Sequence, residues 1–342
     1  IDILKDLTFR TSGSYMWQQV RKDYWDNGNT KTASSNQSPY GYGCRNNSEK
    51  FSWQITNTLN YAFNVEEVHR FNVLLGQETW YQESMNLDNE YRKFSDGNFG
   101  LNDVSMGTPQ TWKSGKSRVG LVSFFGRLSY NYSDRYLFTG TLRADGSSKF
   151  ARGQQWGYFP SASAAWRISD ESFMEWSKDW LSTLKMRASY GKSGNARVGS
   201  YWRQTYSPVT STKNLYYQNE IGQSSLQPAK RLRNENLTWE SKFSTNVGFD
   251  FGFFNNRINL TFDYYNDVTK DLIMEVQLPS NAGYSSQYQN LGQTTNRGVE
   301  LSLNANLVQT KDFYLDFNFN IAFNKNKVDA LYGANGDEMI LS

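Results

Sequence analysis

The chain has 342 residues, and its 36 Lys and Arg against 33 Asp and Glu give a formal net charge of +3. With this near-balance, neither the basic field of a nucleic-acid-binding protein nor an acidic tail dominates, so we expect no nucleic-acid partner. Aromatic residues make up 16% of the chain although only 38% of it is hydrophobic, and the mean hydropathy is −0.72. Disordered chains are poor in aromatic residues, so this composition indicates a folded protein with very polar surfaces.

Alternation of apolar and polar residues is the dominant pattern, and it has the period of a β-strand with one apolar face. It predicts eleven strands, at about 4–17, 51–63, 69–81, 119–132, 136–144, 159–168, 181–191, 236–251, 257–270, 295–307 and 313–326. The strongest helical candidate is 170–180, a short amphipathic turn that Asp170 would cap. The predicted fold class is therefore all-β.

The connections between these strands alternate in length along the chain. The short ones are about 64–68, 133–135, 169–180, 252–256 and 308–312, and the long ones are 18–50, 82–118, 145–158, 192–235 and 271–294. In an up-and-down meander, all short turns then lie at one rim and all long loops at the other. Outer-membrane barrels pair short periplasmic turns with long extracellular loops. Aromatic residues beside the short turns suit a headgroup girdle, so we predict an antiparallel up-and-down transmembrane β-barrel. A soluble, carbohydrate-binding β-sandwich fits this asymmetry less well.

The sequence has one histidine, His69, and one cysteine, Cys44. This scarcity excludes most metal sites, disulfides and histidine-dependent catalytic sites within the chain. A zinc site of the usual His/Cys kind needs three or four protein ligands, and a single cysteine forms no disulfide within the chain. No nucleophile motif surrounds His69, which we interpret as a turn or surface residue, and no carboxylate pair stands in a recognisable catalytic context. We expect no enzyme, no metal and no cofactor.

The sequence contains no apolar run long enough for a transmembrane helix and no visible signal peptide. It begins with Ile1 rather than Met. We therefore expect a processed chain or an internal piece of a longer protein.

Six stretches, each weak alone, carry a family resemblance in their order along the chain. They are RADGSSKF at 143–150, FPSASAAWRISDE at 159–171, LKMRASYGKSGN at 184–195, NENLTWE at 234–240, NNRINLTFDYYN at 255–266 and NRGVELSLN at 296–304. Together they resemble the SusC/RagA family of TonB-dependent outer-membrane transporters of Bacteroidetes.

The resemblance implies a fold, a function and partners. Family members have a barrel of about 22 strands, a plug domain and a TonB box, and this chain resembles the middle of the barrel. Residues 1–342 then form a partial barrel with about eleven of those strands, without plug, TonB box or the remaining strands. The implied function is TonB-dependent import of large nutrients, glycans or peptides, across the Gram-negative outer membrane. The implied partners are a SusD-like surface lipoprotein, outer-membrane lipid, and the TonB complex through the missing plug. A passive porin or an outer-membrane assembly component is the alternative.

A basic ladder is the first set of candidate functional residues. If Phe138 and Leu142 face lipid, alternation turns Arg143 towards the lumen. The same parity gives a lumen-facing ladder on four consecutive strands, formed by Arg127, Arg143, Arg167, Lys185 and Arg187. Such a ladder could attract an anionic substrate or seat an acidic plug surface. We favour a structural role for the ladder, in which its residues pair across strands and contact the plug.

Aromatic residues of the predicted long loops are the second set: Trp112, Trp156, Tyr158, Tyr201, Trp202, Tyr206, Tyr216 and Tyr217. Aromatic faces stack on sugar rings, and they also anchor protein–protein interfaces. Because bare aromatic surface is unfavourable in water, we predict that loops 82–118 and 192–235 contact a second protein as well as, or instead of, substrate.

Overall fold

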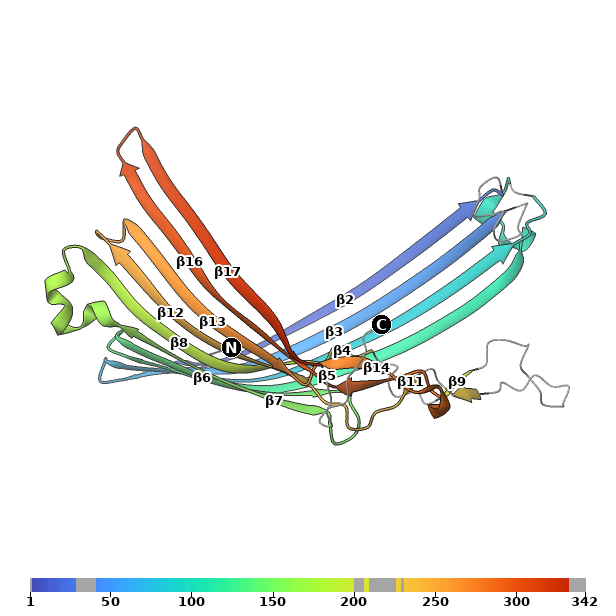
Figure 1. The fold of residues 1–342 in the computed structure, drawn as a ribbon, viewed down its shortest axis with the longest axis horizontal. Helices are drawn as coiled ribbons and strands as arrows, with labels where there is room; N and C mark the ends of the chain where they lie inside the picture. The colour runs from blue at the N-terminus through green and yellow to red at the C-terminus, as the bar shows by residue number, and fades with distance from the viewer. Residues whose placement is uncertain are drawn as a thin grey trace. The chain divides into compact units, whose positions relative to one another are not determined.

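A computed structural model describes residues 2–28, 41–96, 98–199, 206–208, 226–228 and 231–331. Twelve strands form one sheet, and each pairs with the next of these strands along the chain (Figure 1). They are β1 (Asp2–Leu4), β2 (Leu7–Asp26), β3 (Tyr42–Val65), β4 (His69–Arg92), β5 (Thr108–Tyr132), β6 (Tyr136–Ser147), β7 (Trp156–Arg167), β8 (Leu181–Asn195), β12 (Glu240–Phe253), β13 (Ile258–Lys270), β16 (Gln293–Gln309) and β17 (Tyr314–Ala330). The eleven predicted strands are confirmed, and the three-residue β1 is an addition. In the described part of the chain, no helix is long and apolar enough to cross a membrane.

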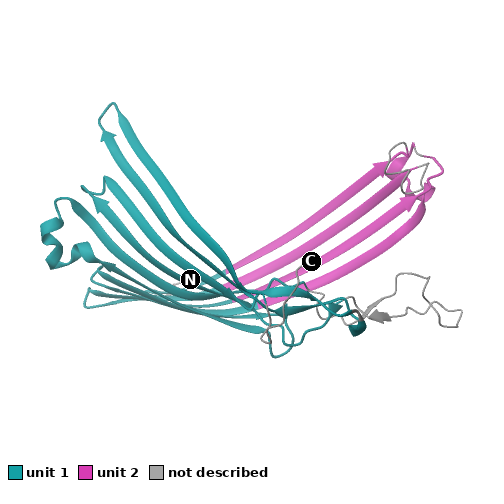
Figure 2. Cartoon of the chain, in the orientation of Figure 1, with its two compact units in different colours: residues 1–11, 57–77, 122–342 teal, residues 12–56, 78–121 magenta. Residues whose placement is uncertain are grey.

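The chain divides into two compact units, residues 1–11, 57–77 and 122–342, and residues 12–56 and 78–121 (Figure 2). The first unit holds β6 to β17 and one end of each of β2 to β5. The second unit holds the other ends of β2 to β5 and the connections that join them. A small core closes the second unit: Phe94 is 1% exposed, and its ring meets Trp25 edge-on at 4.6 Å. Gly43 allows this packing, because a Cβ there would lie 2.6 Å from Cδ2 of Leu101.

The strands from β6 to β17 pair in antiparallel register with a consistent division of faces. One face carries Phe243, Val247, Phe249, Leu301 and Leu303, and we call it the apolar face. The opposite face carries Glu240, Lys242, Ser244, Glu300 and Ser302, and we call it the polar face. Directly paired residues share a face, so the local alternation extends across every strand pair. This division is the one that the sequence predicts.

Three-residue connections join β3 to β4 and β5 to β6 at one end of the sheet in the first unit. Glu66 and Glu67, and likewise Ser133 and Asp134, have φ between 52° and 56°. Positive φ at two successive residues gives the turn that matches the twist of paired strands. The prediction of short turns at these positions is correct.

The connection from β7 to β8 is longer and forms two 3₁₀ helices, η3 (Ile168–Asp170) and η4 (Ser172–Ser177). The predicted cap at Asp170 is wrong. The residue that precedes η4 is Glu171, and no side chain caps this helix. Asp170 instead accepts a hydrogen bond from the Ser169 hydroxyl at 3.1 Å and pairs with Arg167 at 3.4 Å.

The long connections are shorter than predicted, because several strands continue through polar sequence. Residues 18–26, 42–50, 82–92 and 108–118 belong to strands β2 to β5 rather than to loops. The described residues of the connection from β4 to β5 include two 3₁₀ turns, η1 (Gly100–Asn102) and η2 (Val104–Met106). Where both faces of a strand are polar, apolar and polar residues no longer alternate. The ends of these strands were therefore predicted as loops.

Two other long connections contain strands that were not predicted from the sequence. The connection from β8 to β12 includes a hairpin of β9 (Tyr206–Pro208) and β10 (Leu226–Pro228), followed by β11 (Arg231–Leu232). The connection from β13 to β16 includes β14 (Ile273–Gln277), the 3₁₀ turn η6 (Ser280–Ala282) and β15 (Ser286–Asn290). Strands β11, β15 and β14 form a separate three-stranded sheet, so these two loops fold together.

Candidate functional site

The five residues of the basic ladder all lie on the polar face. Arg167 lies directly opposite Lys185, and Arg187 lies opposite Ala165 on the same face. Arg143 is two residues from Thr141, which pairs with the polar-face residue Ser161. Arg127 is two residues from Ser129, whose hydroxyl is 3.4 Å from that of Thr139 on the adjacent strand.

Arg187 forms the most highly connected ion pair of the ladder. Its Nε and Nη2 donate to Asp250 at 2.8 and 3.0 Å, and Nη2 also donates to Asp263 at 3.2 Å. Gly248 lies between these side chains in the register. A Cβ at Gly248 would lie 2.3 Å from Oδ1 of Asp263 and 2.8 Å from Nη2 of Arg187. This glycine therefore permits one guanidinium to bridge two carboxylates across three strands.

Arg143 is held in a second polar cluster. Its Nε donates to both oxygens of Asp145 at 2.8 and 3.0 Å, and its Nη2 donates to the Ser123 hydroxyl at 2.9 Å. The guanidinium also lies 5.4 Å from the ring centroid of Phe125. That ring covers Gly76, where a Cβ would approach it to 2.1 Å.

Carboxylates therefore compensate much of the ladder's charge. Arg143 and Arg187 have the partners described above, and Arg167 pairs with Asp170 at 3.4 Å. Lys185 lies directly opposite Asp250 in the register. The cations were predicted from the sequence, but their partners Asp250 and Asp263 were not. Both residues fall on the polar face when the apolar and polar residues of their strands are alternated. This alternation could therefore have identified them as partners of the cations.

The loop aromatics divide into strand residues and residues outside the described part of the chain. Trp112 lies on β5 and is 74% exposed, whereas Trp156 and Tyr158 lie on β7. Their predicted placement in loops is wrong. Trp156 and Tyr158 pair with Gly146 and Ala144, on the face of Leu142, so the register turns them to the apolar face. Tyr201, Trp202, Tyr216 and Tyr217 lie outside the described residues, and so does the side chain of Tyr206.

Aromatic rings line the apolar face beside the short turns. His69 begins β4, and its Nδ1 lies 2.8 Å from the Tyr130 hydroxyl. Rings continue across neighbouring strands with centroids 4.8 to 6.3 Å apart, in the series Phe63, Phe71, Tyr130 and Phe138. Amphipathic rings at such a position suit a membrane interface.

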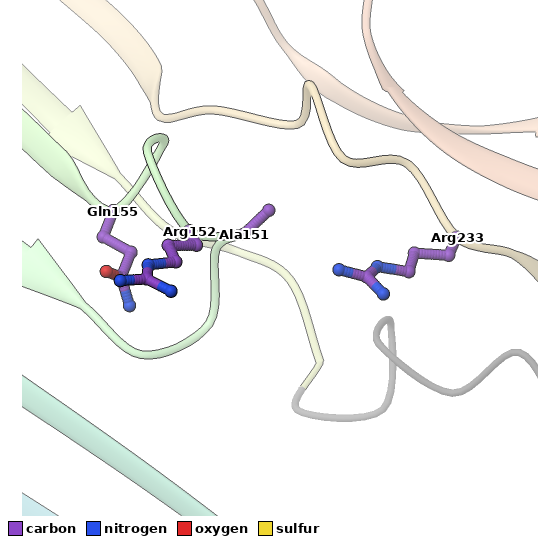
Figure 3. A pocket seen from close by; sticks show the side chains of 4 residues that line it. All are labelled: Ala151, Arg152, Gln155 and Arg233. Atoms are coloured by element: carbon purple, nitrogen blue, oxygen red, sulfur yellow. The ribbon is translucent and has the colours of Figure 1, made fainter.

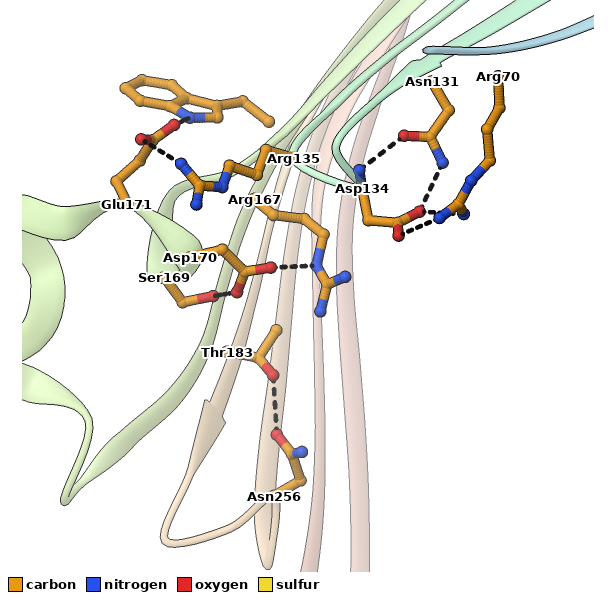
Figure 4. Close-up of polar contacts among 11 residues, drawn as sticks. Arg70, Asn131, Asp134, Arg135, Arg167, Ser169, Asp170, Glu171, Thr183 and Asn256 are labelled. Atoms are coloured by element: carbon orange, nitrogen blue, oxygen red, sulfur yellow. Dashed lines mark hydrogen bonds and ion pairs between the residues drawn. The ribbon is translucent and has the colours of Figure 1, made fainter. Parts of the chain in front are cut away.

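Polar contacts brace the short turns against one another (Figure 4). Arg70 donates to both oxygens of Asp134 at 2.8 and 3.0 Å, and the Asn131 amide donates to Asp134 at 2.7 Å. The hydrogen bond from Asn131, and next the charge of Arg70, hold the pKa of Asp134 below its ordinary value. Two consecutive short turns are thereby linked.

Glu171 links the next turn in the same way. Its carboxylate accepts from the Tyr136 hydroxyl at 2.6 Å and from the Trp166 indole at 3.0 Å, and it pairs with Arg135 at 3.5 Å. The hydrogen bond from Tyr136, followed by that from Trp166, lowers the pKa of Glu171. The carboxylate is therefore ionised and fully engaged at neutral pH.

The opposite end of the first unit carries a loop lock, formed by β11, β15 and β14. Arg231 pairs bidentately with Glu275 at 2.7 and 2.9 Å, and the Ser286 hydroxyl donates to Glu275 at 2.6 Å. The Arg231 guanidinium lies 5.0 Å from the ring centroid of Tyr288. The hydrogen bonds from Arg231, and then from Ser286, lower the pKa of Glu275.

A buried aromatic core lies beneath the loops. Phe150 is fully buried and its ring lies 5.3 Å from that of Trp239, which meets Phe159 edge-on at 5.5 Å. The Trp239 indole donates to the carbonyl of Gln155 at 3.0 Å. The loop end of the first unit thus has packed cores of its own.

An antiparallel sheet with one polar and one apolar face, short braced turns and structured long loops is the architecture of a transmembrane β-barrel wall. The family model of TonB-dependent receptor-like β-barrels matches residues 3–340. The chain belongs to this outer-membrane family.

Similarity to individual receptors places the chain more specifically within this family. The chain is 40% identical over 224 residues to the TonB-dependent receptor SusC of Bacteroides thetaiotaomicron, which is 65% of this chain and 22% of SusC. It is 35% identical over 291 residues to the TonB-dependent receptor P26 of Formosa agariphila, 84% of this chain and 29% of that protein. The structure of the RagAB peptide transporter matches with a TM-score of 0.84 and 26% identity, covering 97% of this chain and 36% of that one.

These similarities support the SusC/RagA resemblance that the sequence motifs indicated. The chain spans less than a third of the length of these two curated relatives.

Proposed function

We propose that this chain is part of the barrel of a TonB-dependent importer of large nutrients, glycans or peptides. The observation that carries the proposal is the match of the barrel family model to residues 3–340, together with similarity to SusC and to RagAB. The whole receptor would supply a plug, a TonB box and further strands. We propose no catalytic activity for this chain.

In this proposal the polar face lines the lumen and the basic ladder has a structural role. Carboxylates on the same face pair with Arg143 and Arg187, and Asp170 in the adjacent turn pairs with Arg167, so little of the ladder's charge is left to attract an anionic cargo. Fixed ion pairs would stiffen the wall against which a plug packs.

The proposed partner is a SusD-like surface lipoprotein at the loop end. Aromatic anchors with a polar rim suit such an interface, and Tyr201, Trp202, Tyr216 and Tyr217 remain the candidates for it. The substrate would be held between the partner and the loops.

Energised transport is tested by uptake in cells that express the full receptor. We expect uptake of a receptor-dependent nutrient to stop when the proton-motive force is collapsed and when TonB is deleted. Uptake that persists under both conditions would establish a passive porin instead.

A further inference from the structure

Positively charged side chains gather on the apolar face of the first unit, at the end of the strands that carries the long loops. They belong to β8, β13, β16 and β17, which with β12 form one continuous run of paired strands. We call them the basic belt: Lys192, Lys270, Arg297, Lys325 and Lys327.

The register places these cations on the apolar face. Lys192 lies directly opposite Phe243, which belongs to that face. Arg297 precedes the apolar-face residue Leu301 by four positions, so alternation turns it to the same side. Lys325 lies directly opposite Arg297 and shares its face. The belt therefore lies on the side of the sheet that a barrel turns to lipid.

Strand β17 shows how abruptly the apolar face changes at the belt. The residues of this strand on the apolar face are, in order, Phe317, Phe319, Ile321, Phe323, Lys325 and Lys327. Phe317 and Lys325 are eight residues apart, which is about 27 Å along the strand and about 21 Å along the membrane normal at a tilt of about 40°. The apolar band of a barrel is about 25 Å tall, so the lysines begin close to its edge.

The ring of Phe243 holds two of the ammonium groups. Nζ of Lys192 lies 5.7 Å from the ring centroid, and Nζ of Lys270 lies 5.8 Å from it. Nζ of Lys192 also lies 5.9 Å from the ring centroid of Phe159. An aromatic ring attracts a cation through its quadrupole but carries no net charge. These ammonium groups are therefore positioned without being neutralised.

Carboxylates compensate the polar face at this end of the strands, but they leave most of the belt unpaired. Lys242 on the polar face pairs with Asp267 at 2.7 Å. On the apolar face of β12, β13, β16 and β17 there is one carboxylate, that of Asp329, and it pairs with Lys327 at 3.2 Å. Within the described part of the chain, no carboxylate pairs with the other four cations of the belt. Four positive charges thus face the membrane surface without a counter-charge from the described residues.

Two further cations of the first unit do not belong to the belt. Arg152 and Arg233 line an open cavity of about 370 Å³ together with Ala151 and Gln155. Figure 3 shows the Arg152 side chain turned towards Gln155 and away from Arg233. These two guanidinium groups do not face a common ligand, whereas the cations of the belt share one face of paired strands.

We propose that the basic belt binds the phosphate groups of an outer-leaflet glycolipid of the lipid A type. Its acyl chains would lie along the apolar face, with the phosphates at the level of the ammonium and guanidinium groups. Arg297 can hold a phosphate through two parallel hydrogen bonds, and the lysines add point charges around it. Clusters of four or more basic residues beside an apolar membrane surface are typical of binding to anionic lipid headgroups. Continuity of the belt with the apolar face favours a lipid over a soluble anion.

The test is an equilibrium titration of the purified full-length receptor in neutral detergent micelles. The probes are a fluorescent lipid A with two phosphates and the same lipid A without phosphates. We expect Arg297→Gln combined with Lys325→Gln to weaken binding of the phosphorylated lipid about tenfold and to leave binding of the other lipid unchanged. Lys192→Gln combined with Lys270→Gln should have the same effect.

The matched control is Lys242→Gln combined with Lys178→Gln. It removes the same net charge, but from the polar face and from the turn after η4 at the opposite end of the unit. We expect it to change neither affinity. Retained heat-modifiable migration on gels would establish that all the variants fold.

Four results would overturn the proposal. They are equal affinity of the unsubstituted receptor for both lipids, unchanged binding in both belt variants, an equal loss in the control, and full competition by inorganic phosphate at constant ionic strength. The last result would assign the belt to a free anion. The titration measures no transport, so failure of the import function would leave its outcome unchanged.

Discussion

Replacing Val247 by arginine should destabilise the barrel by about 2–4 kcal/mol, the cost of an arginine on the lipid face at the bilayer midplane. Val247 lies on the apolar face, opposite Ala188 on one side and Tyr264 on the other. It is six residues from the nearer strand end, Phe253. At about 3.4 Å per residue that end is about 20 Å away along the strand. With a tilt of about 40°, this is about 15 Å along the membrane normal, more than half of the ~25 Å apolar band.

Ser244→Arg on the same strand is the matched control. Ser244 lies on the polar face opposite Asp267, beside a groove lined by small hydroxyl residues such as Ser161 and Ser189. A new arginine there has room in the groove, and Asp267 opposite it already pairs with Lys242 at 2.7 Å. We therefore expect a change within about 0.5 kcal/mol.

The measurement is guanidinium-induced unfolding of the full-length receptor in phospholipid vesicles, followed by tryptophan fluorescence. We expect the midpoint to fall for Val247→Arg and to stay near its original value for Ser244→Arg. Equal shifts for the two variants, or a larger shift for Ser244→Arg, would refute the assignment of faces.

Three further predictions concern the ion pairs and the loops. Gly248→Ala should lower the free energy of unfolding by about 1–3 kcal/mol, because its methyl group collides with the Arg187 pair; a denaturation midpoint equal to that of the original protein would contradict this. Because the pKa of Glu275 is lowered in the folded state, the loop lock should stabilise the loops above the ordinary glutamate pKa of about 4.3 and lose this effect as the pH falls through the folded pKa. The protection factors for hydrogen exchange in the loops, taken relative to the intrinsic exchange rate at each pH, should therefore fall at acidic pH, and Glu275→Gln should abolish that dependence. Deleting residues 199–225, from the connection between β8 and β11, should release the lipoprotein in a pull-down while the barrel stays folded. A complex that survives the deletion would favour substrate contact for those aromatics.

The structure changes the design of the deletion experiment. Removing 82–118, as the predicted loop boundaries imply, would cut the ends of β4 and β5. It would also remove Phe94 and Leu101 from the core of the second unit. A deletion of that range therefore tests folding rather than docking.

The sequence by itself determined the strands, their two faces and the rim that carries the short turns. These properties are local: alternation at a period of two assigns each residue to a face, and short polar segments mark the turns. The same alternation assigned Arg187 and Arg143 to the polar face. Where both faces are polar, as at residues 18–26, the rule loses its signal, and the strand ends were missed for that reason.

Only the tertiary structure decided which side chains meet across strands and loops. Arg187 reaches Asp250 and Asp263 because the register places Gly248 between them. The pairing of Arg231 with Glu275 joins residues 44 positions apart, through strands of two and five residues. Segments this short have no periodicity to detect, and the contacts of Arg231 with Glu275 and Tyr288 that join them are visible only in the tertiary structure.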